Sequence, residues 1–249
     1  MWLCGQSDIG KVRQQNEDFW TFNPPHFMLI ADGMGGHAAG EVASHMAARS
    51  VMLFLQDKTV IDEGTLRDAI GEANHLIYQT AQSNEAYGGM GTTMILGYEC
   101  GNAIHWAHVG DSRMYLYRNQ TLHQITQDHS FVGELERSGQ ITKEEAKVHP
   151  KRNLLTRAVG AEREIEVDTG TLPLEENDML LLCTDGLTNM VSEAEIATII
   201  EAHIDQPEVA LSQLVDIANE NGGSDNITII LAHPDTKQVH TLEDKEVAR

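Results

Sequence analysis

The chain has 249 residues, 41% of them hydrophobic and 22% charged, which is enough for one large globular domain with a substantial core. Its 38 acidic and 17 basic residues give a formal net charge of −21, which would repel a phosphate backbone, so nucleic acid is not expected as a partner. Apolar runs too short to span a membrane, no basic signal-peptide start and three scattered cysteines predict a cytoplasmic protein without a disulfide framework or zinc site.

Hydrophobic periodicity predicts the secondary structure along the chain. In chain order we expect a strand at 27–31, helices at 40–55 and 66–82, strands at 92–98, 103–109 and 114–117, a helix at 130–138, a capped helix start at 142–145, strands at 165–169 and 179–184, helices at 192–201 and 207–219, and a strand at 227–232. Strands and helices do not alternate strictly, which favours an α+β fold of layers built on antiparallel sheets.

Four aspartates stand where a predicted strand ends or begins: Asp32, Asp111, Asp185 and Asp225. A single aspartate beside a glycine is a common turn signal. Strand ends of layered sheets can converge, however, and Asp suits hard cations such as Mg²⁺ and Mn²⁺. Ionised carboxylates about 4 Å apart repel by roughly 1–4 kcal/mol, so a gathered set would require metal.

Two glycine-rich stretches offer rival nucleotide-binding interpretations. Residues 33–38 fit the G-x-G-x-x-G/A turn, but a pyrophosphate there would lie beside the Asp32 carboxylate, and a helix fills the region where a second strand should end in an acidic residue. Residues 5–12 match G-x-x-x-x-G-K, but Val12 stands where a Ser or Thr should hold Mg²⁺. Both interpretations are rejected.

Six motifs occur in an order that resembles one family: RQQNED at 13–18, ADGMGGH at 31–37, GMGTT at 89–93, AHVGDSR at 107–113, TDGL at 184–187 and GSDNIT at 223–228. The chain resembles a metal-dependent Ser/Thr protein phosphatase of the PPM (type 2C) family, in its bacterial single-domain form. The resemblance covers about residues 3–232 and implies a four-layer α-β-β-α sandwich with two central antiparallel sheets. We expect the phosphatase domain to span 1–234 and a polar C-terminal tail to span 235–249.

The resemblance also implies a metal site with two tightly held Mn²⁺ or Mg²⁺ ions. Asp32 should bridge both ions, the Gly33 carbonyl should join the second, and Asp185 and Asp225 should complete the first. The expected outer-shell partners, which would hold metal-bound waters, are Glu17 and Asp18. Asp111 would share a weaker third ion with Asp185, beside a variable segment at 127–151 that resembles the family's flap.

The expected reaction is hydrolysis of phosphoserine and phosphothreonine in proteins by a water that the two ions activate. Arg13 would bind the phosphate oxygens with its planar guanidinium, and the alternative for this residue is a surface salt bridge. Met34 stands where animal members of the family carry a candidate general acid, so a metal-bound water is preferred as the acid over His37.

The expected partners are phosphoprotein substrates and a Ser/Thr kinase that the enzyme opposes, and the expected state is a monomer. The main alternative is a silent relative that keeps the fold and metals but only binds phosphoproteins, with a dinucleotide-binding oxidoreductase as a more distant one.

Overall fold

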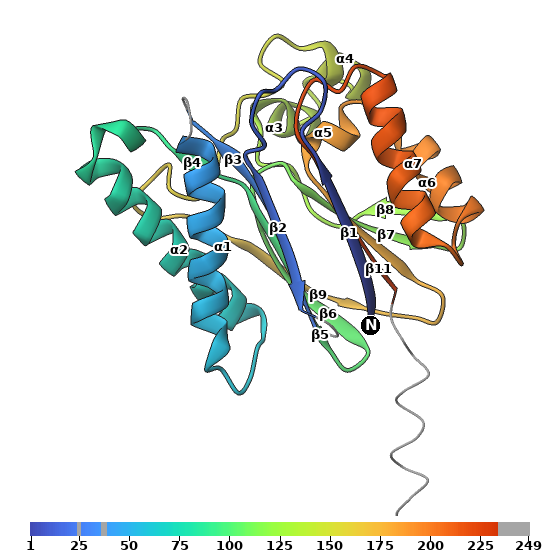
Figure 1. Ribbon diagram of the computed structural model, residues 1–249, viewed down its shortest axis with the longest axis horizontal. Coiled ribbons are helices and arrows are strands. Elements are labelled where there is room, and N and C mark those ends of the chain that lie inside the picture. Colours follow the sequence, from blue (N-terminus) through green and yellow to red (C-terminus); the bar gives the residue numbers. More distant parts are fainter. Residues whose placement is uncertain (24–25, 36–38, 234–249) are drawn as a thin grey trace, which may run out of the picture.

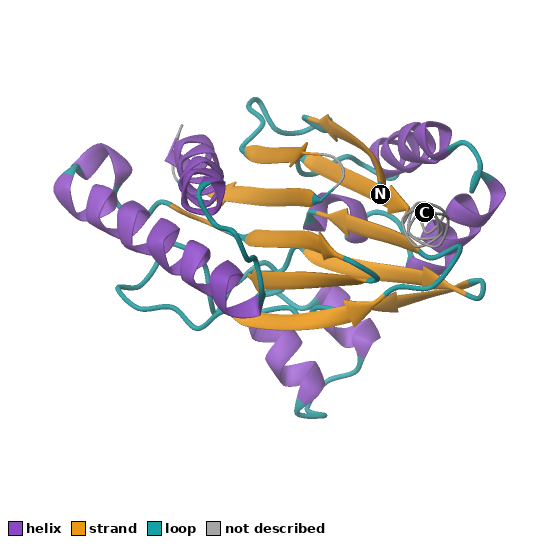
Figure 2. Cartoon of the chain, turned by 90° about the horizontal axis from the view of Figure 1, so that it is seen from below, coloured by secondary structure: helices purple, strands orange, loops and turns teal. Residues whose placement is uncertain are grey.

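The computed structural model describes residues 1–23, 26–35 and 39–233 of the chain. Two antiparallel sheets lie face to face at the centre, and helices cover the outer face of each sheet (Figure 1). Figure 2 shows the same sheets and helices from below. The α-β-β-α arrangement expected from the sequence is confirmed. The expected tail at 235–249 and His37 lie outside the described residues, so those predictions stay open.

One sheet joins the two ends of the described chain. Its strand order is β1, β11, β10, β7, β8, and every neighbouring pair is antiparallel. The bounds are β1 (Trp2–Asp8), β11 (Ile227–His233), β10 (Met179–Cys183), β7 (Arg113–Arg118) and β8 (Thr121–Gln124).

The second sheet is built mainly from the first half of the chain. Its order is β2, β3, β5, β6, β9, with the short β4 paired to β3. The bounds are β2 (Asp18–Asn23), β3 (Phe27–Met34), β4 (Gly91–Thr92), β5 (Met94–Cys100), β6 (Ala103–Val109) and β9 (Asp168–Pro173).

Two helix pairs cover the sheets, and short helices lie at one end (Figure 1). The pairs are α1 (Ala39–Gln56) with α2 (Glu63–Ser83), and α6 (Glu193–Ala202) with α7 (Pro207–Glu220); the short elements are η1 (Glu85–Tyr87), α3 (Phe131–Arg137), α4 (Lys143–Val148) and α5 (Asp185–Thr188). In the described part of the chain, none of these helices has the length and apolar character needed to cross a membrane.

Three hydrophobic clusters hold the four layers together, one between each pair of adjacent layers. Strand β3 shows how its sequence serves two of them. Its alternate residues Met28 and Ile30 pack between the sheets, while Leu29 and Ala31 pack against α1 and α2. Successive side chains of a strand point to opposite faces, so a strand covered on both sides needs a continuous apolar run.

The predicted elements are confirmed except at edges. Strand β9 begins at Asp168, so the strand expected at 165–169 was placed too early, and the strand expected at 92–98 is interrupted at Thr93. Sequence patterns missed β1, β2, β8 and the four-residue α5. The missed strands lie at sheet edges, where each pairs with one neighbour only. Most of their side chains are half-buried, so they lack the apolar runs that mark the central strands.

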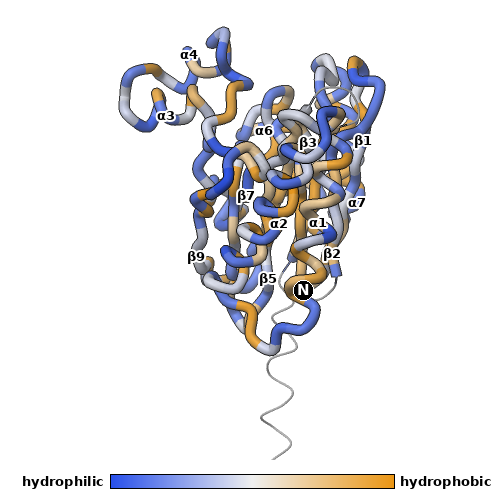
Figure 3. Tube along the Cα trace, turned by 90° about the vertical axis from the view of Figure 1, so that its left-hand side faces the viewer, coloured by the Kyte–Doolittle hydropathy of each residue, from blue (hydrophilic) through white to orange (hydrophobic). Residues whose placement is uncertain are grey.

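The segment 127–151, which we call the flap, stands on one end of the sandwich. Figure 3 shows its helices α3 and α4 projecting from the body of the molecule. The base of the flap is closed by main-chain bonds: Thr156 donates to the His129 carbonyl at 2.9 Å and Phe131 donates to the Leu154 carbonyl at 2.8 Å. The flap therefore stands at the end of the sandwich where β3 and β10 finish.

Candidate metal centre

The structure brings the four aspartates singled out in the sequence to one end of the two sheets. A cavity of about 380 Å³ opens there, beside the base of the flap. Its lining residues are Arg13, Glu17, Asp32, Gly33, Met34, Gly35, Thr93, Asp111, Asn153, Leu154, Leu155, Asp185 and Asp225. Strand ends from both sheets supply the carboxylates, which is why residues so far apart in sequence meet.

Asp32 is fixed through its backbone, which leaves its carboxylate free to face the cavity. Thr93 donates its amide to the Asp32 carbonyl at 2.8 Å, and the Asp32 amide donates to the Thr93 hydroxyl at 3.0 Å. The hydroxyl of Thr92 donates to the same Asp32 carbonyl at 2.8 Å. These contacts explain the GMGTT motif, whose threonines have no role that the sequence alone reveals.

Gly33 follows Asp32 at a point of close backbone approach. A Cβ at this position would clash with the backbone oxygens of Gly40 and Glu17, so only glycine fits. The Gly33 amide donates to the Glu17 carbonyl at 3.1 Å, and the Ser44 hydroxyl donates to that carbonyl at 2.7 Å. Helix α1 is thereby held against the turn.

Asp18 is buried directly behind Asp32. The two residues are cross-strand partners in the β2–β3 register, an unfavourable position for two like charges. Thr184 and Thr228 donate their hydroxyls to Asp18 Oδ2 at 3.0 Å and 2.6 Å. The other carboxylate oxygen, Oδ1, is buried and has no hydrogen-bond partner among the described residues. An unpartnered buried oxygen at this place matches an outer ligand of a hydrated cation.

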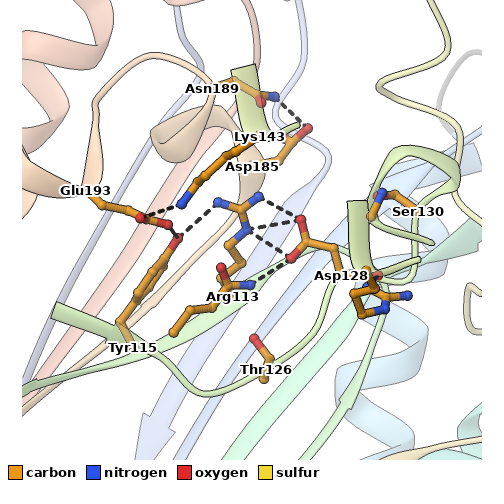
Figure 4. A network of polar contacts seen from close by, with 12 residues as sticks. Arg113, Tyr115, Thr126, Asp128, Ser130, Lys143, Asp185, Asn189 and Glu193 are labelled. Atoms are coloured by element: carbon orange, nitrogen blue, oxygen red, sulfur yellow. Dashed lines mark hydrogen bonds and ion pairs between the residues drawn. The ribbon is translucent and has the colours of Figure 1, made fainter. Parts of the chain in front are cut away.

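Asp111 lies just before strand β7, and a polar network two residues further on ties that strand to the flap (Figure 4). Gly110 precedes Asp111 with a φ of 111°, which glycine adopts without strain. Two residues on, Arg113 makes a forked ion pair with Asp128 at 2.7–3.1 Å and donates to the Tyr115 hydroxyl at 3.0 Å. Fork-shaped pairing of this kind fixes geometry as well as charge.

Hydrogen bonds from neighbouring residues orient the remaining two aspartates. Asn189, four residues along from Asp185, donates to its Oδ2 at 2.9 Å (Figure 4). Arg13 donates to Asp225 Oδ2 at 2.7 Å. Sequence reasoning missed Asn189, because its i, i+4 spacing to Asp185 is a signal only once helix α5 is recognised. The salt bridge considered as an alternative for Arg13 is present.

Burial and mutual repulsion raise the pKa values of these carboxyl groups. The pKa of Asp18 rises to about 7, mainly through burial, and the pKa of Asp185 rises to about 6 through burial and the Asp225 charge. Burial also raises the pKa values of Asp32 and Asp111 well above the usual range, with further contributions from neighbouring aspartates. The site as a whole favours bound positive charge.

The donor set fits a hard divalent cation, although the carboxylate groups do not surround a single point. Among the described residues, no three His, Cys, Asp or Glu side chains form a ready-made metal ligand set. Asp225 is turned to Arg13, and the other carboxylates repel one another. An all-oxygen set with a backbone carbonyl beside it suits Mg²⁺ or Mn²⁺, which keep several waters and need few protein ligands.

Comparisons with known proteins show the family of the chain. A family model described as "Protein phosphatase 2C" matches residues 6–227. "Serine/threonine phosphatase stp" from Listeria welshimeri is 42% identical over 246 residues, covering 94% of this chain and 96% of that protein.

Solved structures of bacterial phosphatases are also similar to this chain in fold and sequence. The serine/threonine phosphatase of S. agalactiae has a TM-score of 0.87 and 36% identity, covering 94% of this chain and 99% of that one. The catalytic domain of the phosphatase PstP, solved with two manganese ions, has a TM-score of 0.84 and 35% identity, covering 92% and 96% of the two chains.

The raised carboxyl pKa values predict a pH dependence of stability without metal. Asp18 binds its proton more tightly in the folded state, with a pKa of about 7, than in the unfolded state, where about 3.9 is usual. The folded state therefore loses stability as pH rises to about 7 and slightly beyond. Burial lowers the pKa of His108 to about 3, which has the opposite sign and adds stability until pH passes about one unit above the unfolded value of about 6.5.

Urea unfolding at pH 6.5 and pH 8.5 in EDTA measures this dependence. We expect the free energy of unfolding to be lower at pH 8.5, and Asp18→Asn to reduce the difference between the two pH values. Added Mg²⁺ should reduce or reverse the difference, because the ion binds ionised carboxylates. A difference between the two pH values that Asp18→Asn leaves unchanged would contradict the pKa assigned to Asp18.

Proposed function

From the premise that the chain belongs to the protein phosphatase 2C family, we propose that its cavity holds two Mn²⁺ or Mg²⁺ ions and that Asp32, Gly33, Asp185 and Asp225 bind them. The protein is a metal-dependent phosphatase of phosphoserine and phosphothreonine in proteins. The observation that carries the proposed site is the convergence of four aspartates and Arg13 on one cavity.

The ions, when bound, lower the pKa of a water so that it can attack phosphorus, and they screen the charge of the phosphate. The chain's own residues do the positioning. Asp32 and the Gly33 carbonyl are presented by the clamped end of β3, and Asp185 is oriented by Asn189. Glu17 and Asp18 lie beside and behind them, placed to hold waters in the outer shell.

Arg13 is proposed to bind the substrate phosphate. Its guanidinium lines the cavity and reaches Asp225 at 2.7 Å, so it stands within reach of a dianion bound beside that carboxylate. Its side chain is 46% exposed, and the pair with Asp225 is therefore weak enough to exchange. A guanidinium fork suits the oxygens of a phosphate monoester.

Asp111 is proposed to share a third, weaker ion with Asp185. Both line a smaller cavity of about 90 Å³ beneath the flap, whose other charged lining residues are Arg113, Asp128, Glu136, Lys143, Lys147 and Arg152. Fewer protein carboxylates face this position, so waters would complete the coordination.

Met34 lines the main cavity and offers no proton, which supports water as the acid.

The biological setting stays predicted. We propose that the enzyme opposes a Ser/Thr kinase and acts as a monomer in the cytoplasm, as expected from the sequence.

A silent phosphoprotein-binding relative is the competing function. It is disfavoured because every aspartate of the proposed site is present. Hydrolysis of a chromogenic aryl phosphate that needs Mn²⁺ and stops with EDTA would establish catalysis. Binding of phosphopeptides without turnover under the same conditions would favour the silent relative.

Asp32→Asn and Asp225→Asn should each lower turnover by at least about a hundredfold, about 3 kcal/mol of barrier, because each removes a ligand charge. Steady-state rates at saturating Mn²⁺ and circular dichroism measure activity and fold. Asp62→Asn is the matched control, because Asp62 caps α2 away from the site and Asn caps a helix equally well. A variant that kept more than a few per cent of wild-type turnover would contradict its ligand assignment.

Arg13→Ala should raise KM for aryl phosphate and phosphopeptide more than it weakens Mn²⁺ binding, since the guanidinium meets the dianion. Kinetics and calorimetric titration with Mn²⁺ separate these two effects. Unchanged KM together with lost Mn²⁺ affinity would assign Arg13 to the structure of the site instead.

Asp111→Ala should keep the two tight ions and the fold, lower turnover, and raise the Mn²⁺ concentration needed for activity. Crystals soaked in Mn²⁺ should contain two ions instead of three. Full activity at low Mn²⁺ would make the third ion a bystander, and loss of all ions would place Asp111 in the two-ion core.

A further inference from the structure

Two cavities adjoin the central one through different lining residues, and the charges of their linings differ in sign. One, of about 510 Å³, shares Arg13, Asn153 and Asp225 with the central cavity and is also lined by Lys147 and Arg152; we call it the basic cavity.

The other, of about 520 Å³, shares Met34 and Leu155 with the central cavity and no lining residue with the basic cavity. Its charged lining residues are Arg157, Glu162, Glu164 and Glu166, and we call it the acidic cavity. A peptide that crosses the central cavity would therefore meet opposite charge on its two sides.

Lys147 and Arg152 differ from the other cations of the flap region in having no local partner. Lys143 pairs with Glu193 at 2.6 Å, and Lys151 lies 5.0 Å above the Phe131 ring. In contrast, neither Lys147 nor Arg152 makes a side-chain hydrogen bond or ion pair within the described chain. Both side chains belong to exposed residues beside the cavity, where a ligand can reach them.

The two carboxylates of the basic cavity make no ion pair with these cations, and its lining keeps one more cation than carboxylates. Glu195 accepts bonds from the Ser192 amide and hydroxyl at 3.0 Å and 2.7 Å, where it caps α6. Asp225 is paired with Arg13. In a chain with a net charge of −21, the basic cavity thus keeps two unpaired cations directly beside the proposed phosphate site.

The acidic cavity has the reverse balance. Among its described lining residues the only cation, Arg157, is paired with Asp168 at 2.9 Å and lies 3.7 Å from Glu166. Glu162 and Glu164 make no ion pair with any described residue, so they would repel an acidic side chain on that side.

We propose that the basic cavity binds an anionic group of the phosphoprotein, a carboxylate or a second phosphate, on one side of the phosphoresidue only. Lys147 and Arg152 are the specificity-determining residues, and the acidic cavity disfavours the same group on the other side. This inference rests on the proposed function, because it uses the central cavity as the place where the phosphoresidue binds.

Two isomeric phosphopeptides test it without a change in net charge. One carries two glutamates before the phosphoserine and two alanines after it, and the other carries the reverse order. We expect kcat/KM to differ at least about fivefold between the isomers, the size of effect that a few exposed charge pairs can give. The difference should shrink in high salt.

The double variant Lys147→Ala/Arg152→Ala should bring the two isomers to within about twofold of each other. Lys151→Ala is the matched control, because it removes one neighbouring positive charge outside the basic cavity and should keep the preference. Replacing the glutamates on the preferred side by a second phosphoserine distinguishes the two sources of anion, since the better substrate identifies the group that the cavity favours.

Several outcomes would overturn the inference. These are equal rates for the two isomers with the wild-type enzyme, a preference that survives in the double variant, or an equal loss of rate on both isomers, which would mean that the cations only support the flap. Binding of fluorescent, non-hydrolysable isomers separates the two proposals. Preferential binding without hydrolysis would support the basic cavity and contradict the proposed catalysis, whereas hydrolysis without preference would contradict the basic cavity alone.

Discussion

The constraint on which the structure depends is the gathering of like charges at one end of two facing sheets. Carboxylates that repel one another cannot be placed by their own interactions, so the backbone must place them. Threonine hydroxyls bond the Asp32 carbonyl and the buried Asp18 carboxylate, and closely packed glycines leave no slack beside them. The apolar layers, in turn, anchor the strands that end there. The packing of the layers thus fixes the positions of the carboxylates against their mutual repulsion.

Much of this could be predicted from sequence, for physical reasons that differ by element. Central strands such as β10 are covered on both faces and therefore show as unbroken apolar runs. Helix starts at Thr142 and Ser192 follow from their capping residues, and both capping boxes are formed. The edge strands β1 and β2 are half-buried with mixed composition, so no run or strict alternation marked them.

The site was predictable in membership but not in geometry. Each of the four aspartates can be recognised because it stands beside a predicted strand. Nothing local in the sequence indicates that Asp18 and Asp32 become cross-strand partners, because their register depends on β2, which was not predicted. Likewise, the charges of the two adjoining cavities come from residues such as Lys147 and Glu162. These residues lie on different segments of the chain, and only folding brings them to cavities beside the central one.

The flap contributes almost nothing to the core. Helix α3 buries no residue and α4 buries only Ala146, whereas Asp128 and His129 at the base of the flap bond to the body of the molecule through their side chains. Most substitutions within α3 and α4 should accordingly carry little penalty in folding. The sequence of the flap can therefore change during evolution while the strands of the proposed metal site stay constant. Related enzymes could acquire new phosphoprotein substrates in this way without any change in the catalytic residues.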